Sequence, residues 1–195
     1  MSGLTKAVNN LFHNRSLRRT LLTYRLFLAV TAIALILYYA KSDFFYAAFA
    51  TSMFGEFIQL WCFASLDKQK ELASNGLYKH IRNPMYLGRF FIVLGYFLLL
   101  GNIYAVIPFT IIYYLYMWHR VEREEEQLKK VFGQPYQEYC EQVNRFIPSF
   151  KGMPGGKFWF WEWRLFYQNH GPANLSAVLL SYAAAYIWFF VIQTG

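Results

Sequence analysis

Long apolar runs separated by short polar segments dominate the pattern of this chain. The runs cover about residues 22–40, 44–66, 85–118 and 173–192, and each holds at most one charged residue. A helix that crosses a bilayer needs ~20 mostly apolar residues. Because these runs are apolar on every face and not along one stripe, they are typical of membrane-spanning helices rather than of amphipathic helices on a soluble protein.

The run at 85–118 is too long for a single crossing. Gly101 and Asn102 stand near its middle, and this pair favours a tight turn between two helices. We therefore predict an all-α fold in which residues 1–195 form a single membrane-embedded domain. Its five predicted spans cover about residues 22–40, 44–66, 85–100, 103–118 and 173–192.

The distribution of charge orients this topology. With the N-terminus inside, the inner segments 1–25, 67–89 and 119–170 hold five, five and eight lysines and arginines, which is 18 of the 19, and only Lys41 lies outside. Cytoplasmic loops carry such an excess of positive charge. We expect an integral protein of the cell membrane, with the N-terminus and active site cytoplasmic and the C-terminus outside. The net charge of +8 then faces membrane lipid, and we expect no nucleic-acid partner.

The composition indicates neither a metal site nor a disulfide. Four histidines and two cysteines are scattered without the spacing of metal ligands. Cys62 lies in a predicted span and Cys140 in a cytoplasmic segment, so we expect no bond between them. At the N-terminus, Leu11–Tyr24 is predicted as an interfacial helix, with a disordered tail as the alternative.

Polar residues gather on the two inner segments that adjoin the predicted hairpin. A hairpin brings its ends to one membrane face, so the turn Arg82–Tyr86 should meet the charged segment His119–Glu126. We predict one continuous helix over about residues 104–131, on which Arg120 and Glu124 share a face. From spacing alone, a solvated charged helix remains the alternative.

Four groups of residues carry a resemblance to a known family. In chain order they are Gly76-Leu77-Tyr78, Arg82-Asn83-Pro84-Met85-Tyr86-Leu87-Gly88, Arg120-x3-Glu124-Glu125-x2-Leu128-x3-Phe132-Gly133-x2-Tyr136-x2-Tyr139, and Arg145-Phe146-Ile147-Pro148. This ordered set resembles the isoprenylcysteine carboxyl methyltransferase family, including its short prokaryotic members, within the wider membrane phospholipid methyltransferase superfamily. The resemblance covers about residues 67–150.

The resemblance implies an enzyme that uses S-adenosylmethionine to methylate the carboxylate of an isoprenylcysteine-like, lipophilic or prenylated substrate, with S-adenosylhomocysteine as the product. It places cofactor-binding positions on Leu72, Ala73, Tyr78, Asn83, Pro84, Met85, Tyr86 and Glu124. Arg120 matches the arginine that family members place beside the substrate carboxylate. Tyrosine ring faces suit the sulfonium cation of the cofactor, and a carboxylate suits its hydroxyl or ammonium groups.

One departure from the family pattern bears on the methyl acceptor. Asn83 stands where the carboxyl methyltransferases commonly have histidine, and Asn83-Pro84-Met85-Tyr86 is more similar to the phospholipid N-methyltransferases. A carboxylate is already ionised at neutral pH and needs only an orienting cation, which Arg120 provides. A phosphatidylethanolamine-type amine must first lose a proton, and Glu125 or His119 is the candidate base.

Arg120 and Glu125 are therefore the predicted catalytic residues. Methylation of a phospholipid amine stays open as an alternative. From other classes, a non-catalytic membrane binding protein and a relative of the nicotinamide-dependent sterol reductases stay open too.

Two polar features fall outside the resemblance or in a predicted span. Glu56 is the one acidic residue within a predicted span, and we expect Arg89 to be its partner. Residues 152–157 are predicted as a linker, and the aromatic-rich residues 158–171 should lie at the membrane interface. Within this last segment, the candidates to close over the active site are Glu162, Arg164, Asn169 and His170.

Overall fold

The computed structural model of the protein describes residues 38–67, 72–149 and 155–193, together with residues 23, 24, 27 and 31. Most of the helix predicted at Leu11–Tyr24, most of the first predicted span and the start of the predicted linker lie outside the described residues. The chain divides into two compact units, Met1–Ala40 and Lys41–Gly195. All elements that form the candidate site belong to the second unit.

Helices make up this second unit. A 3-10 turn, η1 (Ser42–Phe44), leads into α4 (Phe45–Ser65), and a second one, η2 (Gly76–Lys79), precedes α5 (Pro84–Leu98). There follow α6 (Ile103–Phe132), α7 (Gln134–Gln142), α8 (Trp163–Gln168), α9 (Gly171–Ile187) and the π-helical turn η3 (Trp188–Ile192). The described ranges contain no strand, only an isolated bridge between Ile81 and Asn144. The prediction of an all-α fold is confirmed.

The turn between α5 and α6 forms where the sequence predicts it. Gly101 has a φ of +55°, a left-handed conformation that glycine adopts at little cost. The side chain of Asn102 accepts a hydrogen bond from the backbone N–H of Tyr104 at 2.9 Å and so caps α6. From this cap α6 runs 30 residues without interruption, which confirms the predicted continuous helix.

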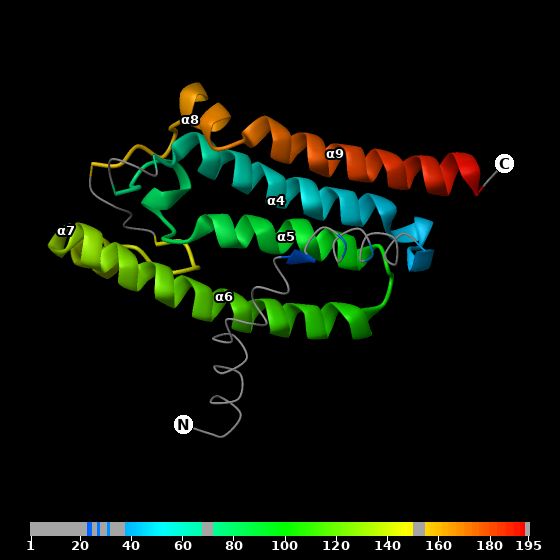
Figure 1. The fold of residues 1–195 in the computed structure, drawn as a ribbon, viewed down its shortest axis with the longest axis horizontal. Coiled ribbons are helices and arrows are strands. Elements are labelled where there is room, and N and C mark those ends of the chain that lie inside the picture. Colours follow the sequence, from blue (N-terminus) through cyan, green and yellow to red (C-terminus); the bar gives the residue numbers. More distant parts are fainter. Residues whose placement is uncertain are drawn as a thin grey trace, which may run out of the picture. The chain divides into compact units, whose positions relative to one another are not determined.

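Four long helices lie side by side in the order α9, α4, α5 and α6 (Figure 1). Glycines allow α4 and α5 to touch, because a Cβ atom on Gly55 would lie 2.5 Å from the carbonyl oxygen of Gly88. On the other side of α4, Tyr182 of α9 donates a hydrogen bond to the carbonyl of Ala48 at 3.0 Å and shares another with Ser52 at 2.7 Å. Hydroxyl groups and small residues thus hold this layer together.

The predicted partner of Glu56 is wrong. Glu56 is fully buried in α4 and accepts a hydrogen bond at 2.7 Å from Asn174 of α9. Arg89 of α5 instead contacts Met85 and lies over the ring of Tyr86, 5.8 Å from its centroid. The reason is helical rotation: Gly55 faces α5, and the next residue of a helix points about 100° away from it, here toward α9.

One predicted span coincides with a described helix that has the length and composition needed to cross a membrane. Among the described helices, Gly171–Ile192 is long and apolar enough to cross a bilayer, and α5 is apolar but shorter. The C-terminal span therefore agrees with a described helix of suitable length and composition. The count of five spans stays a prediction.

Candidate active site

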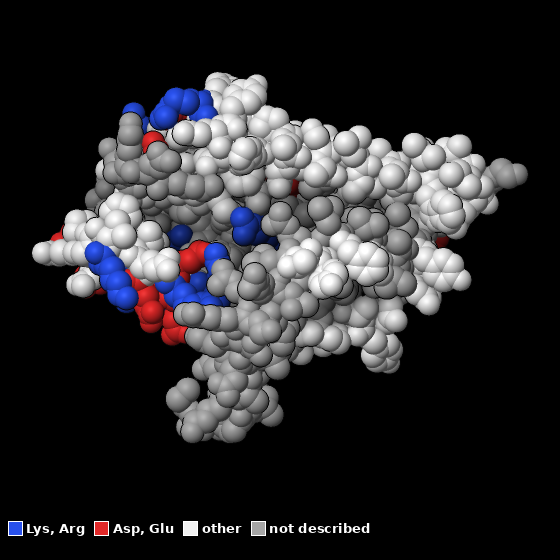
Figure 2. All heavy atoms as spheres, viewed as in Figure 1, with Lys and Arg blue, Asp and Glu red and all other residues white. Residues whose placement is uncertain are grey.

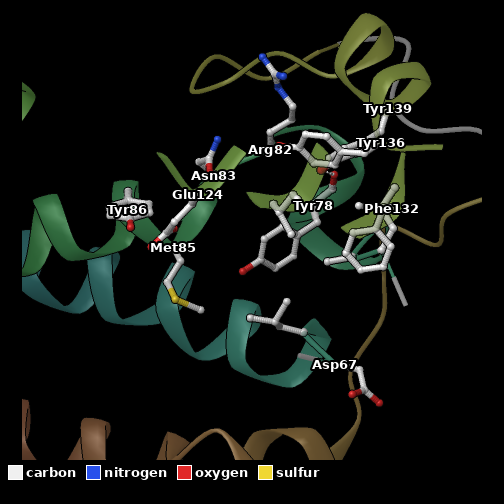
Figure 3. A pocket seen from close by; sticks show the side chains of 14 residues that line it. Asp67, Tyr78, Arg82, Asn83, Met85, Tyr86, Glu124, Phe132, Tyr136 and Tyr139 are labelled. Atoms are coloured by element: carbon white, nitrogen blue, oxygen red, sulfur yellow. Dashed lines mark hydrogen bonds between the residues drawn. The ribbon is translucent and has the colours of Figure 1, made fainter. Parts of the chain in front are cut away.

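A cavity of about 250 Å³ opens where the end of α4, the start of α5, the last turns of α6 and α7 meet (Figure 3). Its described walls are largely apolar, with carboxylate, amide, phenol and guanidinium groups among them. The lining residues are Leu66, Asp67, Leu72, Ala73, Tyr78, Arg82, Asn83, Met85, Tyr86, Glu124, Leu128, Phe132, Tyr136 and Tyr139. Segments more than 70 positions apart in the sequence therefore share one site.

The structure brings most of the predicted cofactor residues to this cavity. Seven of the eight line it, namely Leu72, Ala73, Tyr78, Asn83, Met85, Tyr86 and Glu124. The eighth, Pro84, is buried beneath the wall as the first residue of α5, a position where the missing N–H of proline costs nothing. In Figure 3 the hydroxyl end of Tyr78 and the thioether of Met85 point into the same open space.

Arg120 lies at the edge of the cavity and joins two of its lining residues. Its Nε donates to Glu124 at 2.8 Å and to the hydroxyl of Tyr86 at 3.3 Å. Both bonds use the same nitrogen of the guanidinium group. The hydrogen bond with Tyr86 and the nearby charge of Glu124 raise the pKa of Arg120 above its usual value, so this side chain keeps its charge.

Glu125 lies behind the cavity wall in a cluster of charges. It is buried, and Arg145 donates two hydrogen bonds to it, of 3.2 and 2.6 Å. Asn83 donates to the same carboxylate at 3.1 Å, and Arg82 approaches it to 3.7 Å. The hydrogen bond with Glu125 raises the pKa of Arg145. This cluster confirms that the turn before α5 meets the acidic segment of α6.

Backbone contacts strengthen the same junction. The N–H groups of Arg82 and Asn83 donate to the carbonyls of Asn144 and Arg145 at 2.9 and 3.2 Å. The guanidinium carbon of Arg145 also lies 4.8 Å from the centre of a Trp118 ring. The turn, α6 and the segment after α7 are therefore fixed to one another around Glu125.

Sequence reasoning assigned no role to several lining residues. They are Leu66, Asp67, Arg82, Leu128, Phe132, Tyr136 and Tyr139. Tyr136 and Tyr139 reach the cavity because the chain reverses at Gly133, whose φ is +60°. The hydroxyl of Tyr139 donates to the carbonyl of Tyr78 at 2.6 Å. Phe132, Tyr136 and Tyr139 already stand in the family motif, and that membership is the signal from which a place in the cavity could have been predicted.

The C-terminal candidates lie beside the cavity and do not line it in the described part of the chain. Arg164 pairs with Glu162 at 2.8 Å and approaches Asp67, a lining residue, to 3.6 Å. Asn169 donates to backbone carbonyls at the end of α4, and His170 takes a left-handed conformation just before α9. Arg164 is thus the member of this group that reaches the wall of the cavity.

Comparison with known proteins gives a family and several relatives. A family model described as phospholipid methyltransferase matches residues 24–135, which is more than half of the chain. A protein-S-isoprenylcysteine O-methyltransferase of Schizosaccharomyces pombe is 33% identical over 82 residues, 42% of this chain and 35% of the relative.

Proteins of the same name extend the similarity to animals. The one from Xenopus laevis is 33% identical over 82 residues, 42% of this chain and 28% of the relative. The one from Homo sapiens is 30% identical over 82 residues, 42% of this chain and 29% of the relative. The chain therefore spans about a third of the length of these relatives. No solved structure matches it.

Proposed function

Because this chain belongs to the phospholipid methyltransferase family, we propose that its cavity binds S-adenosylmethionine and that the protein methylates a lipophilic acceptor in the membrane. One observation carries the proposal: seven residues that the family pattern assigns to the cofactor, drawn from separate segments, line a single cavity. The acceptor group that fits best is the carboxylate of an isoprenylcysteine-like compound.

The cavity suits the nucleoside part of the cofactor in size and chemistry. Sites for small molecules measure ~300–1,000 Å³, and this one, at about 250 Å³, is closer to a nucleoside-sized ligand than to a lipid. Apolar and aromatic side chains such as Leu128 and Phe132 provide a surface for a flat base. Glu124 can accept hydrogen bonds from hydroxyl or ammonium groups, and Tyr78 and Tyr86 offer ring faces to a cation.

When bound, S-adenosylmethionine supplies a methyl group carried on a sulfonium cation. The protein's part is to hold donor and acceptor in line, because positioning supplies most of the rate gain in such a displacement. Arg120 is placed for the acceptor, since it keeps its charge and binds Glu124 and Tyr86 through Nε. Its two terminal nitrogens can then orient a carboxylate in bidentate fashion.

The geometry argues against Glu125, one of the two candidate bases, and so favours a carboxylate acceptor over an amine that would depend on this residue. An amine acceptor needs a base, and the oxygens of Glu125 are already engaged by Arg145, Asn83 and Arg82. We propose that Glu125 positions the turn before α5. Methylation of a phospholipid amine remains the second candidate, because Asn83 and the residues after it follow the N-methyltransferase pattern. Its rate would rise with pH through the amine pKa, whereas the rate with a carboxylate would stay flat across neutral pH.

The test is calorimetric titration of the detergent-solubilised protein with S-adenosylhomocysteine. We expect saturable binding, weakened about tenfold or more in Glu124→Gln because a charge-assisted hydrogen bond is lost. The matched control is Glu126→Gln, a change on the same helix at an exposed position that does not line the cavity. Folded wild-type protein that binds no S-adenosylhomocysteine would overturn the proposal.

A further inference from the structure

A second cavity adjoins the first. It also measures about 250 Å³, and the two share Asp67, Leu72 and Ala73 as a common wall. Its remaining lining residues are Ser65, Ser74, Asn75, Phe160, Glu162, Arg164 and Leu165. Hydroxyl, amide, carboxylate and guanidinium groups therefore gather here, in contrast with the mostly apolar first cavity.

The outer wall of the second cavity is fixed to the bundle. The carbonyl of Phe160 accepts hydrogen bonds from Trp61 at 3.2 Å and from Ser65 at 3.3 Å. The N–H of Glu162 donates to the carbonyl of Ala64 at 3.0 Å, and that of Lys157 donates to the side chain of Asn75 at 2.9 Å. The segment before α8 is thus held against the end of α4 and beside η2, where it covers the shared wall.

Charges alternate across this second cavity. Arg164 lies between two carboxylates, with its Nε 2.8 Å from Glu162 and a terminal nitrogen 3.6 Å from Asp67. Asp67 is the residue of this trio that also lines the first cavity. Figure 3 shows Asp67 at the far end of the first cavity from Tyr86. An anion and a cation therefore lie side by side, close to the point where the cavities join.

This pattern complements a zwitterion. S-adenosylmethionine is larger than the nucleoside part that the first cavity suits. Its amino-acid end carries an ammonium group and a carboxylate separated by one carbon. Apolar groups and Glu124 in the first cavity suit the nucleoside part. Arg82 is the cation among the described lining residues of the first cavity, and its other charged lining residues are Asp67 and Glu124. At the Asp67 end, Arg164 of the second cavity is the described cation that approaches this wall, at 3.6 Å from Asp67.

We propose that the amino-acid end of the cofactor enters the second cavity, where Arg164 binds its carboxylate and Asp67 its ammonium group. The inference rests on the proposed function and adds two residues to the cofactor site. Arg164 lies beyond residues 24–135 that match the family model. The C-terminal part of the chain then contributes directly to cofactor binding as well as to membrane attachment.

The experiment compares two ligands by calorimetry on the full-length protein in detergent. S-adenosylhomocysteine carries the amino-acid end, and 5′-methylthioadenosine lacks it. We expect Arg164→Ala to weaken binding of S-adenosylhomocysteine about tenfold or more, as the loss of a charge-assisted hydrogen bond implies. The same variant should leave binding of 5′-methylthioadenosine unchanged. Lys130→Ala, an exposed change at the end of α6, is the control and should alter neither.

Each result decides between the proposals. Equal weakening of both ligands by Arg164→Ala, or no weakening of either, would overturn the inference and leave the proposed function standing. If Arg164→Ala does not fold, Asp67→Asn serves instead and should weaken binding of S-adenosylhomocysteine more than binding of 5′-methylthioadenosine. Equal effects of Asp67→Asn on both ligands would again overturn the inference. Folded wild-type protein that binds neither ligand would instead overturn the proposed function.

Discussion

Two adjacent glutamates on α6 occupy different surroundings. Glu124 lines the cavity and pairs with Arg120, whereas Glu125 is buried among Arg145, Asn83 and Arg82. Successive residues of an α-helix point about 100° apart, so one step along the chain moves a carboxylate from the cavity to the cluster behind its wall. We therefore expect Glu124 to govern ligand affinity and Glu125 to govern stability.

Glu125→Gln should lower the free energy of unfolding by about 3 kcal/mol or more, because it leaves two arginines without their buried counter-ion. The side chains of Arg82 and Arg145 are 14% and 24% exposed, which keeps the effect toward the lower end of that range. Thermal unfolding of the ligand-free protein in detergent measures it. Glu124→Gln is the matched control and should melt close to wild type, since its ion pair with Arg120 is partly exposed.

The opposite outcome has a clear meaning. A Glu125→Gln protein that melts like wild type but no longer methylates an amine acceptor would make Glu125 the general base. The phospholipid amine would then replace the carboxylate as the leading acceptor.

Family motifs contain residues of the cavity wall and residues of the cluster behind it, but they do not say which side chains pair. Tyr78, Asn83 and Glu124 sit in recognisable motifs, and the structure places all three in the wall. The arrangement around Glu125 depends on Arg145, 20 positions later, and no spacing rule predicts that pair. Glu56 shows the same limit, because its partner depends on how α9 lies against α4 and not on any local pattern.

At the scale of elements, the reversal at Gly133 completes the cavity. It turns α7 back so that Tyr139 donates to the carbonyl of Tyr78, the residue that stands at the centre of the cavity wall. Both tyrosines are buried, and burial raises the pKa of Tyr78 and of Tyr139 well above their usual value near 10. Both hydroxyls therefore stay protonated in the folded protein at alkaline pH.

This predicts a loss of stability at high pH. The unfolded chain releases tyrosine protons above about pH 10, while the folded chain retains them at Tyr78 and Tyr139. The unfolded state then binds fewer protons, so the free energy of unfolding falls as pH rises above that value.

Tyr139→Phe should make this fall shallower, although it costs about 1–3 kcal/mol at neutral pH by leaving the buried carbonyl of Tyr78 without its donor. Denaturant unfolding at pH 8 and above pH 10 measures both effects, and an unchanged slope in Tyr139→Phe would contradict the assignment.

The elements differ in how well the chain predicts them. Gly101 and Asn102 predict the hairpin of α5 and α6, because the left-handed glycine and the capping side chain form the turn with neighbouring residues alone. The placement of α7 and of the segment before α8 cannot be predicted in that way. It depends on hydrogen bonds to residues 61 positions away for Tyr139 and 99 positions away for Phe160.

At the scale of the whole second unit, charge separates the two ends of the bundle. On the face shown in Figure 2, lysines, arginines and acidic residues gather at the end that carries α7 and α8, and the flank formed by α9 shows none. At the opposite end, the N–H of Lys41 donates to the carbonyl of Leu99 beside the turn between α5 and α6. Since Tyr182 contacts Ala48 near the start of α4, the last turns of α9 reach that same end.

These contacts make the predicted membrane topology testable. If the charged end is cytoplasmic, Lys41 and Gln193 face the outside and Lys130 faces the inside. A membrane-impermeant maleimide should then label Lys41→Cys and Gln193→Cys in intact cells, and Lys130→Cys only after the membrane is opened. All three positions are exposed, whereas the native Cys62 is buried and Cys140 is partly buried. Labelling of the wild-type protein measures the background from these two native cysteines. Because the fold places Lys41 and Lys130 at opposite ends of the bundle, labelling of both from the same side would contradict a bundle that spans the bilayer and would leave the helices lying along its surface.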